Sequence, residues 1–169
     1  EAKGAGYPSA YAGGLVGNIS GGKTEYCAAA VKVAGTAAAG GLIGTGADSA
    51  SIKGCYSGGH TYDGAYDKWI DDYGYDVEGT NAGGLVGSFT GHVENSYSTC
   101  SVSSSSDNGN AGGLAGSANG IITNCYCTGL VNGADDGNKN AFIGTGNLTS
   151  HENDKYYAAV NEELEDDRS

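Results

Sequence analysis

The stretch Ala12-Gly13-Gly14-Leu15-Val16-Gly17 decides the fold of this chain, because the same pattern returns four more times. Three copies are close and the last is degraded: Ala39-Gly40-Gly41-Leu42-Ile43-Gly44, Ala82-Gly83-Gly84-Leu85-Val86-Gly87, Ala111-Gly112-Gly113-Leu114-Ala115-Gly116 and Asn138-Lys139-Asn140-Ala141-Phe142-Ile143-Gly144. The closing glycines of successive copies lie 27, 43, 29 and 28 residues apart. A period near 28 residues is typical of a solenoid, in which each repeat buries its apolar face by stacking on its neighbours.

Each repeat has a second half that is centred on a tyrosine. A valine follows five residues after the tyrosine in three copies, at Val31, Val102 and Val131. Turn-forming Gly, Asn, Asp and Ser separate short segments that favour strands, and no helical period is sustained before residue 158. We therefore predict an all-β fold, a parallel β-solenoid (β-helix) of about five coils with two or three short strands per coil.

The repeated leucines and tyrosines are the structural ladders that this arrangement predicts. The leucines, expected to form one buried column, are Leu15, Leu42, Leu85 and Leu114. The tyrosines, expected to form a second column, are Tyr26, Tyr56, Tyr97 and Tyr126, with a weak fifth copy at Tyr156. Small Ser and Cys neighbours favour tyrosines that face outward, whereas the recurrence of a large ring favours tyrosines that face inward. Both orientations stay open from the sequence.

These patterns resemble the GLUG-motif repeats of bacterial surface proteins, whose core is Gly-Leu-(any)-Gly, here Gly14-Leu15-Val16-Gly17. The companion pattern of that family, Asn-(Cys/Ser)-Tyr-x-Thr-Gly-x-Val, is matched best by Asn124-Cys125-Tyr126-Cys127-Thr128-Gly129-Leu130-Val131. The resemblance covers roughly residues 12–157. It implies an extracellular, adhesin-like module or a non-catalytic region of a surface protein, and it implies no catalytic residues.

Bulk properties limit the partners and the location. The net charge of −12 and the pI near 4.3 oppose binding to nucleic acid or to anionic membranes. No apolar run approaches the ~20 residues that membrane insertion needs. The chain starts at Glu1, which removal of a secretory signal peptide or excision from a longer protein would explain, and we expect an extracellular or cell-surface location. Asn18 and Asn147 begin N-glycosylation sequons.

Three regions follow from the repeat boundaries. Residues 1–11 form an N-terminal lead-in or cap, residues 12–157 form the repeat solenoid, and residues 158–169 form an acidic tail or a capping helix. The five cysteines lie in the solenoid. Alignment on the tyrosines puts Cys27 in one column with Cys127, and Cys55 in another with Cys125. Such pairs lie in non-adjacent coils, about 9.6 Å or more apart, beyond the about 6.8 Å that a disulfide spans, which favours buried thiols. An extracellular location would favour disulfides instead, and both states stay open from the sequence.

The 43-residue spacing contains an insertion of about 15 residues within residues 59–80, and this insertion is the predicted ligand site. Aromatic rings can stack on sugars, and carboxylates can accept hydrogen bonds from hydroxyl groups. The alternative is that the aromatic residues pin the loop onto the solenoid. The candidate ligand-binding residues are Trp69, Tyr62, Tyr66, Tyr73, Tyr75, Asp67 and Asp71.

We expect no cofactor and no metal. Calcium is the weaker alternative, because the acidic insertion and the turn Asp135-Asp136-Gly137-Asn138 offer oxygen ligands without EF-hand spacing. The three histidines lack the spacing of a zinc site with the cysteines. Paired carboxylates such as Asp63 and Asp67 have no basic residue beside them in a repeated groove, which argues against a glycosidase or lyase.

The sequence therefore predicts a non-enzymatic extracellular structural or adhesive module. A chain that is nearly all solenoid has little room for bulky caps, so head-to-tail stacking into a filament is part of this prediction. The expected partners are other copies of the chain, or glycans and proteins of the cell surface and extracellular space. The alternative is a glycan-binding module that uses the insertion around Trp69.

Overall fold

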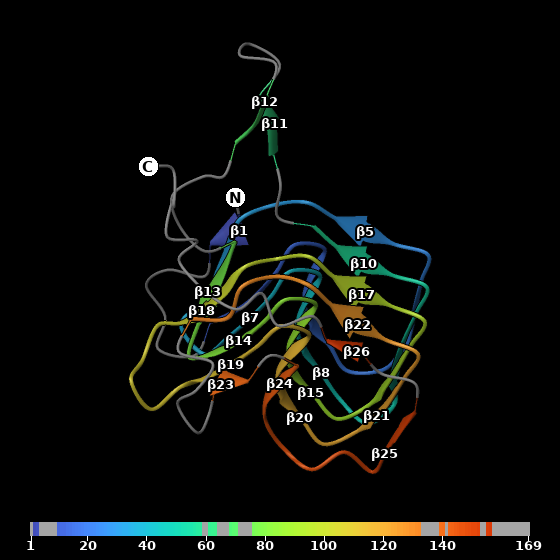
Figure 1. Ribbon diagram of the computed structural model, residues 1–169. Helices are drawn as coiled ribbons and strands as arrows, with labels where there is room; N and C mark the ends of the chain where they lie inside the picture. Colours follow the sequence, from blue (N-terminus) through green and yellow to red (C-terminus); the bar gives the residue numbers. More distant parts are fainter. Residues whose placement is uncertain are drawn as a thin grey trace, which may run out of the picture.

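The computed structural model describes residues 2–3, 10–58, 61–63, 68–70, 76–132, 139–140, 142–152 and 155–156, with side chains at residues 10–58, 76–132 and 142–150. Its parallel strands form stacked sheets, and five coils follow one another from the blue end of the ribbon to the red end (Figure 1). The predicted all-β, parallel β-solenoid is confirmed. Each sheet contains one strand from each successive coil, which is the pairing that a period near 28 residues predicts.

Five sheets, which we name A to E, run along the solenoid. Sheet A contains β1 (Ala2–Lys3), β6 (Val33–Ala34), β13 (Val77–Gly79) and β18 (Val102–Ser104). Sheet B contains β2 (Tyr11–Gly13), β7 (Ala38–Gly40), β14 (Asn81–Gly83), β19 (Asn110–Gly112) and β23 (Lys139–Asn140). Sheet C contains β3 (Val16–Ile19), β8 (Ile43–Gly46), β15 (Val86–Phe89), β20 (Ala115–Ala118) and β24 (Ile143–Thr145).

The last two sheets complete each coil. Sheet D contains β4 (Gly22–Glu25), β9 (Ala50–Lys53), β16 (His92–Glu94), β21 (Ile121–Thr123) and β25 (Ser150–Glu152). Sheet E contains β5 (Ala28–Ala29), β10 (Tyr56–Ser57), β17 (Tyr97–Ser98), β22 (Tyr126–Cys127) and β26 (Lys155–Tyr156). The prediction of two or three strands per coil is therefore wrong, because the second and third coils each have five strands of two to four residues. Frequent glycine and asparagine corners cut each coil into these short pieces.

The glycine motif lies at the corner between sheets B and C, where the backbones of these sheets approach each other closely. Gly40 and Gly83 lie opposite each other in sheet B, and the closing glycine of one copy contacts the next coil. A Cβ atom on Gly40 would overlap the carbonyl oxygen of Ile43 and lie 2.6 Å from the backbone nitrogen of Gly87. The two backbones therefore meet with no space for a side chain, and only glycine fits.

This backbone contact divides the interior into two apolar clusters. The larger cluster lies between sheets C, D and E and includes Leu42, Ile52, Leu85, Phe89 and Leu114, all of them almost fully buried. The smaller cluster lies between sheets A and B; its valines and alanines are Val33, Val77, Val102, Ala12, Ala39, Ala82 and Ala111. The leucine ladder is buried as predicted at Leu42, Leu85 and Leu114.

The alignment of the first coil differs from the prediction by two residues. Ala28, and not Tyr26, lies opposite Tyr56 in sheet E. Tyr26 instead occupies the corner before the strand, with a positive φ of 55°, as do Gly54, Asn95 and Asn124 at 62°, 51° and 52°. The tyrosine column therefore contains only Tyr56, Tyr97 and Tyr126, which lie opposite one another in successive coils.

The same two-residue offset corrects the valine and cysteine columns. Val33, and not Val31, lies opposite Val77 in sheet A. Cys27 precedes Ala28 and therefore lies beside Cys55 in the adjacent coil, so its predicted column with Cys127 is wrong. At the last coil, Lys155 lies opposite Tyr126, so the fifth tyrosine copy is displaced by one residue.

The insertion leaves the solenoid between β10 and β13. Ser57 and Val77 are twenty residues apart, whereas the equivalent Ser98 and Val102 are four residues apart. Within the extra residues, β11 (Thr61–Asp63) and β12 (Lys68–Ile70) form an antiparallel pair outside the stack of coils (Figure 1). The predicted tail or helix at 158–169 lies outside the described residues.

Candidate functional site at the open end of the first coil

The first coil ends the solenoid with a row of terminal strands. Strands β2, β3, β4 and β5 are each the outermost strand of their sheet, and β1 extends only sheet A. The amides show the direction of pairing: Leu15 donates to the carbonyl of Leu42 over 2.9 Å, and Leu42 donates to the carbonyl of Leu85 over the same distance. Each leucine carbonyl thus faces the preceding coil, so the carbonyl of Leu15, in the first coil, points out of the stack. Such an edge is a template for another strand.

The leucine column changes from buried to exposed at this end. Leu42, Leu85 and Leu114 have no exposed surface, whereas Leu15 is 48% exposed. The prediction that Leu15 is buried with the others is therefore wrong. The physical reason is that a solenoid residue is covered by the coils on both sides, and the strands that the structure describes place such a coil on one side of Leu15 only.

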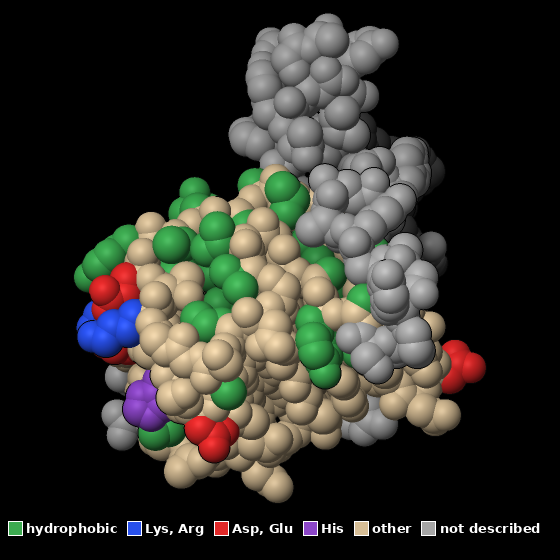
Figure 2. All heavy atoms as spheres, turned by 180° about the vertical axis from the view of Figure 1, so that it is seen from behind, with side chains coloured by type: hydrophobic (Ala, Val, Ile, Leu, Met, Phe, Trp, Pro, Cys, Tyr) green, Lys and Arg blue, Asp and Glu red, His purple; other side chains and the backbone are tan. Residues whose placement is uncertain are grey.

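A second exposed apolar side chain lies beside Gly14, the residue before Leu15. Val31 is 36% exposed, and its Cγ2 atom would lie 2.9 Å from a Cβ placed on Gly14. Gly14 also faces Ala29 of β5, so the chain from sheet B meets the chain that leaves sheet E. We call this surface of Gly14, Leu15, Ala29 and Val31, with the edges of β2 to β5, the open end. In Figure 2 hydrophobic side chains gather on the upper part of the described surface, toward the first coil.

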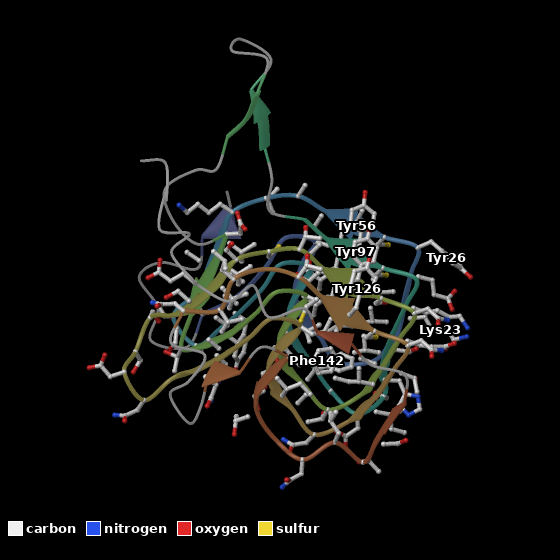
Figure 3. The ribbon with its side chains drawn as sticks, in the orientation of Figure 1. Lys23, Tyr26, Tyr56, Tyr97, Tyr126 and Phe142 are labelled. Carbon is white, nitrogen blue, oxygen red and sulfur yellow. The ribbon has the colours of Figure 1, made fainter. Side chains whose placement is uncertain are left out.

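The tyrosines form an exposed ladder on the outer face of sheet E. The ring centroids of Tyr56 and Tyr97 are 5.1 Å apart with planes 5° from parallel, and those of Tyr97 and Tyr126 are 4.8 Å apart at 3°. Figure 3 shows the three rings as one column. Partial burial and the neighbouring phenols raise the pKa of Tyr97. The structure thus decides the open question in favour of tyrosines that face outward, where they stack with one another.

A charged row follows the outer edge of sheet D. The Lys53 ammonium lies 3.2 Å from the Glu94 carboxylate, and Glu25 is opposite Lys53 on the other side. The hydrogen bond to Glu94 and the attraction of its charge raise the pKa of Lys53. Both side chains are well exposed, so this ion pair contributes little to stability. It joins two residues that lie opposite each other in adjacent coils.

The buried hydroxyl and thiol groups serve the backbone. Ser57 Oγ donates to the carbonyl of Gly84 over 2.6 Å, and Ser96 Oγ donates to the carbonyl of Glu94 over 2.8 Å. Cys55 Sγ donates to the carbonyl oxygens of Thr24 and Lys53 at 3.3 Å each. These groups satisfy carbonyls in the thin interior, which is a structural role.

The predicted ligand site lies largely beyond what the structure describes. Tyr62 of β11 lies opposite Trp69 of β12 in the antiparallel pair, which brings these two positions together. The remaining five residues, Tyr66, Asp67, Asp71, Tyr73 and Tyr75, lie outside the described residues, as does the acidic turn 135–138. Among the side chains that are described, no group of three His, Cys, Asp or Glu could hold a metal ion.

Sequence reasoning missed two features of the first coil, the exposed Leu15–Val31 surface and the Cys27–Cys55 neighbours. A sequence signal bears on the second feature alone, because the exposure of Leu15 follows from its place in the end coil. In the later copies the corner residue is Gly54, Asn95 or Asn124, residue types that tolerate positive φ. This signal fails at the first coil, where Tyr26 takes the corner, and the register of Cys27 became clear only from the backbone pairing.

Comparison of the chain with family models, curated protein sequences and solved structures found no match. Membership of the GLUG-motif family therefore stays a prediction from the residues quoted above. In the part of the chain that the structure describes, no helix has the length and apolar character to cross a membrane.

Proposed function

We propose that the chain is a non-enzymatic extracellular structural or adhesive module that stacks head to tail, with the last coil of one copy on the open end of the next. The observation that carries this proposal is the exposure of Leu15, whose column-mates Leu42 and Leu85 are completely buried by coils on both sides. A further coil placed on β2 to β5 would continue the sheets and cover that leucine.

Two observations, the terminal strands and the engaged polar groups, support assembly over catalysis. The four terminal strands offer backbone groups of one fixed spacing, which another copy of the same solenoid matches. The contact joins different ends of the two copies, so it repeats without closing and produces a filament. The buried serine and cysteine groups described above are engaged with backbone carbonyls.

The test compares sedimentation of the wild-type chain with two variants that each add one carboxylate. Leu15→Asp places the charge on the open end, and Ser51→Asp places it on the outer face of sheet D. We expect wild type and Ser51→Asp to associate with rising protein concentration and Leu15→Asp to stay monomeric, because burying an unpaired charge at the contact is costly. A monomeric wild-type chain at high concentration, or equal association of Leu15→Asp, would rule out this mode of stacking.

The second candidate function is glycan binding by the insertion. The observation that favours it is the pairing of Tyr62 with Trp69 in a hairpin that leaves the regular coils. Trp69→Ala should then abolish retention on a glycan array and leave the thermal melt nearly unchanged. If the melt collapses instead, the hairpin is a structural pin and the binding proposal fails.

A further inference from the structure

Cys27 and Cys55 are direct neighbours in adjacent coils. The pairing of Ala28 with Tyr56 places the two preceding cysteines side by side, and the amide of Cys27 lies 3.4 Å from Cys55 Sγ. Paired positions on neighbouring strands are about 4.8 Å apart, and disulfides join Cα atoms about 4.4–6.8 Å apart. The spacing that argued against a bridge from the sequence therefore applied to the wrong partners.

We propose that Cys27 and Cys55 are an oxidisable pair that closes into a disulfide between the first and second coils. This inference rests on the register of sheet E and is independent of assembly or glycan binding. The other members of the same column limit the choice of partner. Ser96 follows Cys55 and lacks a thiol, and Cys125 lies one coil further on.

The two thiols differ in access, which assigns them different roles. Cys27 is half-buried at the open end, whereas Cys55 is 1% exposed. Burial is the main factor that raises the pKa of Cys55. Cys27 is therefore the thiol that an external oxidant reaches first, and Cys55 is the thiol that completes the bridge.

The oxidant is a low-molecular-weight disulfide such as oxidised glutathione. The Cys27 thiolate attacks one glutathione sulfur, the glutathione disulfide bond breaks, and one glutathione thiolate leaves. Cys55 then loses its proton to water, and its thiolate attacks the Cys27 sulfur and expels the second glutathione thiolate, while the two leaving thiolates take up protons. Two thiols are thus oxidised and one external disulfide is reduced.

The movement required is small and local. Cys27 Sγ lies 3.2 Å from the carbonyl oxygen of Glu25, and Cys55 Sγ contacts the equivalent carbonyl of Lys53. Rotation of Cys27 about its Cα–Cβ bond releases the first contact and turns the sulfur toward Cys55. Cys27 directly precedes β5, the outermost strand of sheet E, so no further strand of that sheet in the described residues obstructs this rotation.

The experiment treats the reduced full chain with oxidised glutathione and maps its disulfides by mass spectrometry of non-reduced peptides. We expect one Cys27–Cys55 link, the loss of two hydrogen atoms per chain, and a melting midpoint that rises by roughly 5 °C or more and returns on reduction. Cys55→Ser should stop at a stable glutathione adduct on Cys27, while Cys100→Ser should still form the link.

Cys27→Ser controls for the fold, because its reduced melt should match that of the reduced wild type and it should gain no stability on oxidation. Three outcomes would overturn the proposal: a persistent adduct on Cys27 in the wild type, a link between the Cys27 residues of two chains, or no reaction at Cys27 in a folded chain.

Discussion

At the scale of single residues, the decisive property of the glycine motif is the absence of a side chain. Gly40, Gly83 and Gly112 lie opposite one another in sheet B, and a Cβ on each would overlap backbone atoms of sheet C. A Cβ on Gly83 would overlap the carbonyl oxygen of Val86 and lie 2.5 Å from the backbone nitrogen of Gly116. Backbone atoms on both sides cannot move without disturbing two coils. The two glycines at the start of each motif therefore set how thin the solenoid is.

Gly83→Ala should accordingly destabilise the fold by about 1–3 kcal/mol, the range of strain for an added methyl group in a packed interior. Urea denaturation followed by circular dichroism measures this change. Gly58→Ala is the matched control, since among the described residues its Cβ would meet only Thr99 Oγ1 at 3.6 Å. Equal midpoints for the two variants would show that the sheets separate more easily than this packing implies.

The buried thiols make stability depend on alkaline pH. Burial raises the pKa of Cys100 to about 11 and that of Cys127 to about 12, from an ordinary value of 9.0. Above pH 9 the unfolded chain loses these protons while the folded chain keeps them, so the stability that is complete below pH 9 falls as pH rises toward 11–12.

We expect each thiol to contribute a loss of about 1.4 kcal/mol per pH unit across this range. Urea melts of wild type and of Cys127→Ser between pH 8 and pH 10.5, under reducing conditions, measure the difference in slope. Serine suits this position because Ser98 occupies it in the preceding coil. Parallel pH profiles would mean that the Cys127 thiol ionises in the folded chain as readily as in water.

At the scale of the strand and its corner, one backbone conformation repeats before sheet E. Gly54, Asn95 and Asn124 adopt positive φ, and Asn124 donates to the side-chain oxygen of Asn95 over 3.2 Å. Tyr26 is the exception in residue type, with its ring over Gly54 and 79% of its surface exposed. The corner thus ends one short strand and starts the next in each coil.

Replacing Tyr26 by Asn should stabilise the chain by about 0.5–1 kcal/mol. The reason is that the left-handed backbone conformation costs less free energy for asparagine than for tyrosine. Tyr26→Phe keeps the strain and is expected to match wild type. Thermal and urea melts of both variants provide the comparison. A loss of stability in Tyr26→Asn would show instead that the contact of the ring with Gly54 outweighs the strain.

At the scale of the whole molecule, the solenoid has two ends and a strongly negative charge. The open end exposes Leu15 and Val31, and the chain carries a net charge of −12. Repulsion between copies therefore opposes the apolar contact that the proposed stacking makes. Salt screens such repulsion over about 8–10 Å at physiological ionic strength and leaves apolar burial intact.

Association should therefore strengthen as ionic strength rises. Removal of residues 161–169, which contain five of the acidic residues, should strengthen it further at low salt if the tail acts through its charge. Light scattering across a salt series, with the full and the truncated chain at equal concentrations, measures both effects. Weaker association of the truncated chain would place the tail within the contact.

The sequence alone was sufficient for the period, the parallel solenoid and the buried identity of Leu42, Leu85 and Leu114. These follow from spacing, because residues that recur once per coil must stack. It was also sufficient to locate the insertion, since the coil that contains it is longer than the others. A property that recurs in every coil can be predicted from the sequence, because the residues that produce it recur with the same period.

The tertiary structure alone decided what happens where the repeat ends. The exposure of Leu15 depends on the presence of a preceding coil, which the leucine itself does not encode. The register of Cys27 depends on Tyr26 taking a corner conformation that is usual for Gly and Asn but costly for tyrosine. The burial of a side chain and the identity of its cross-strand partner both depend on the neighbouring coils. At the first coil they therefore follow from backbone pairing and not from residue type.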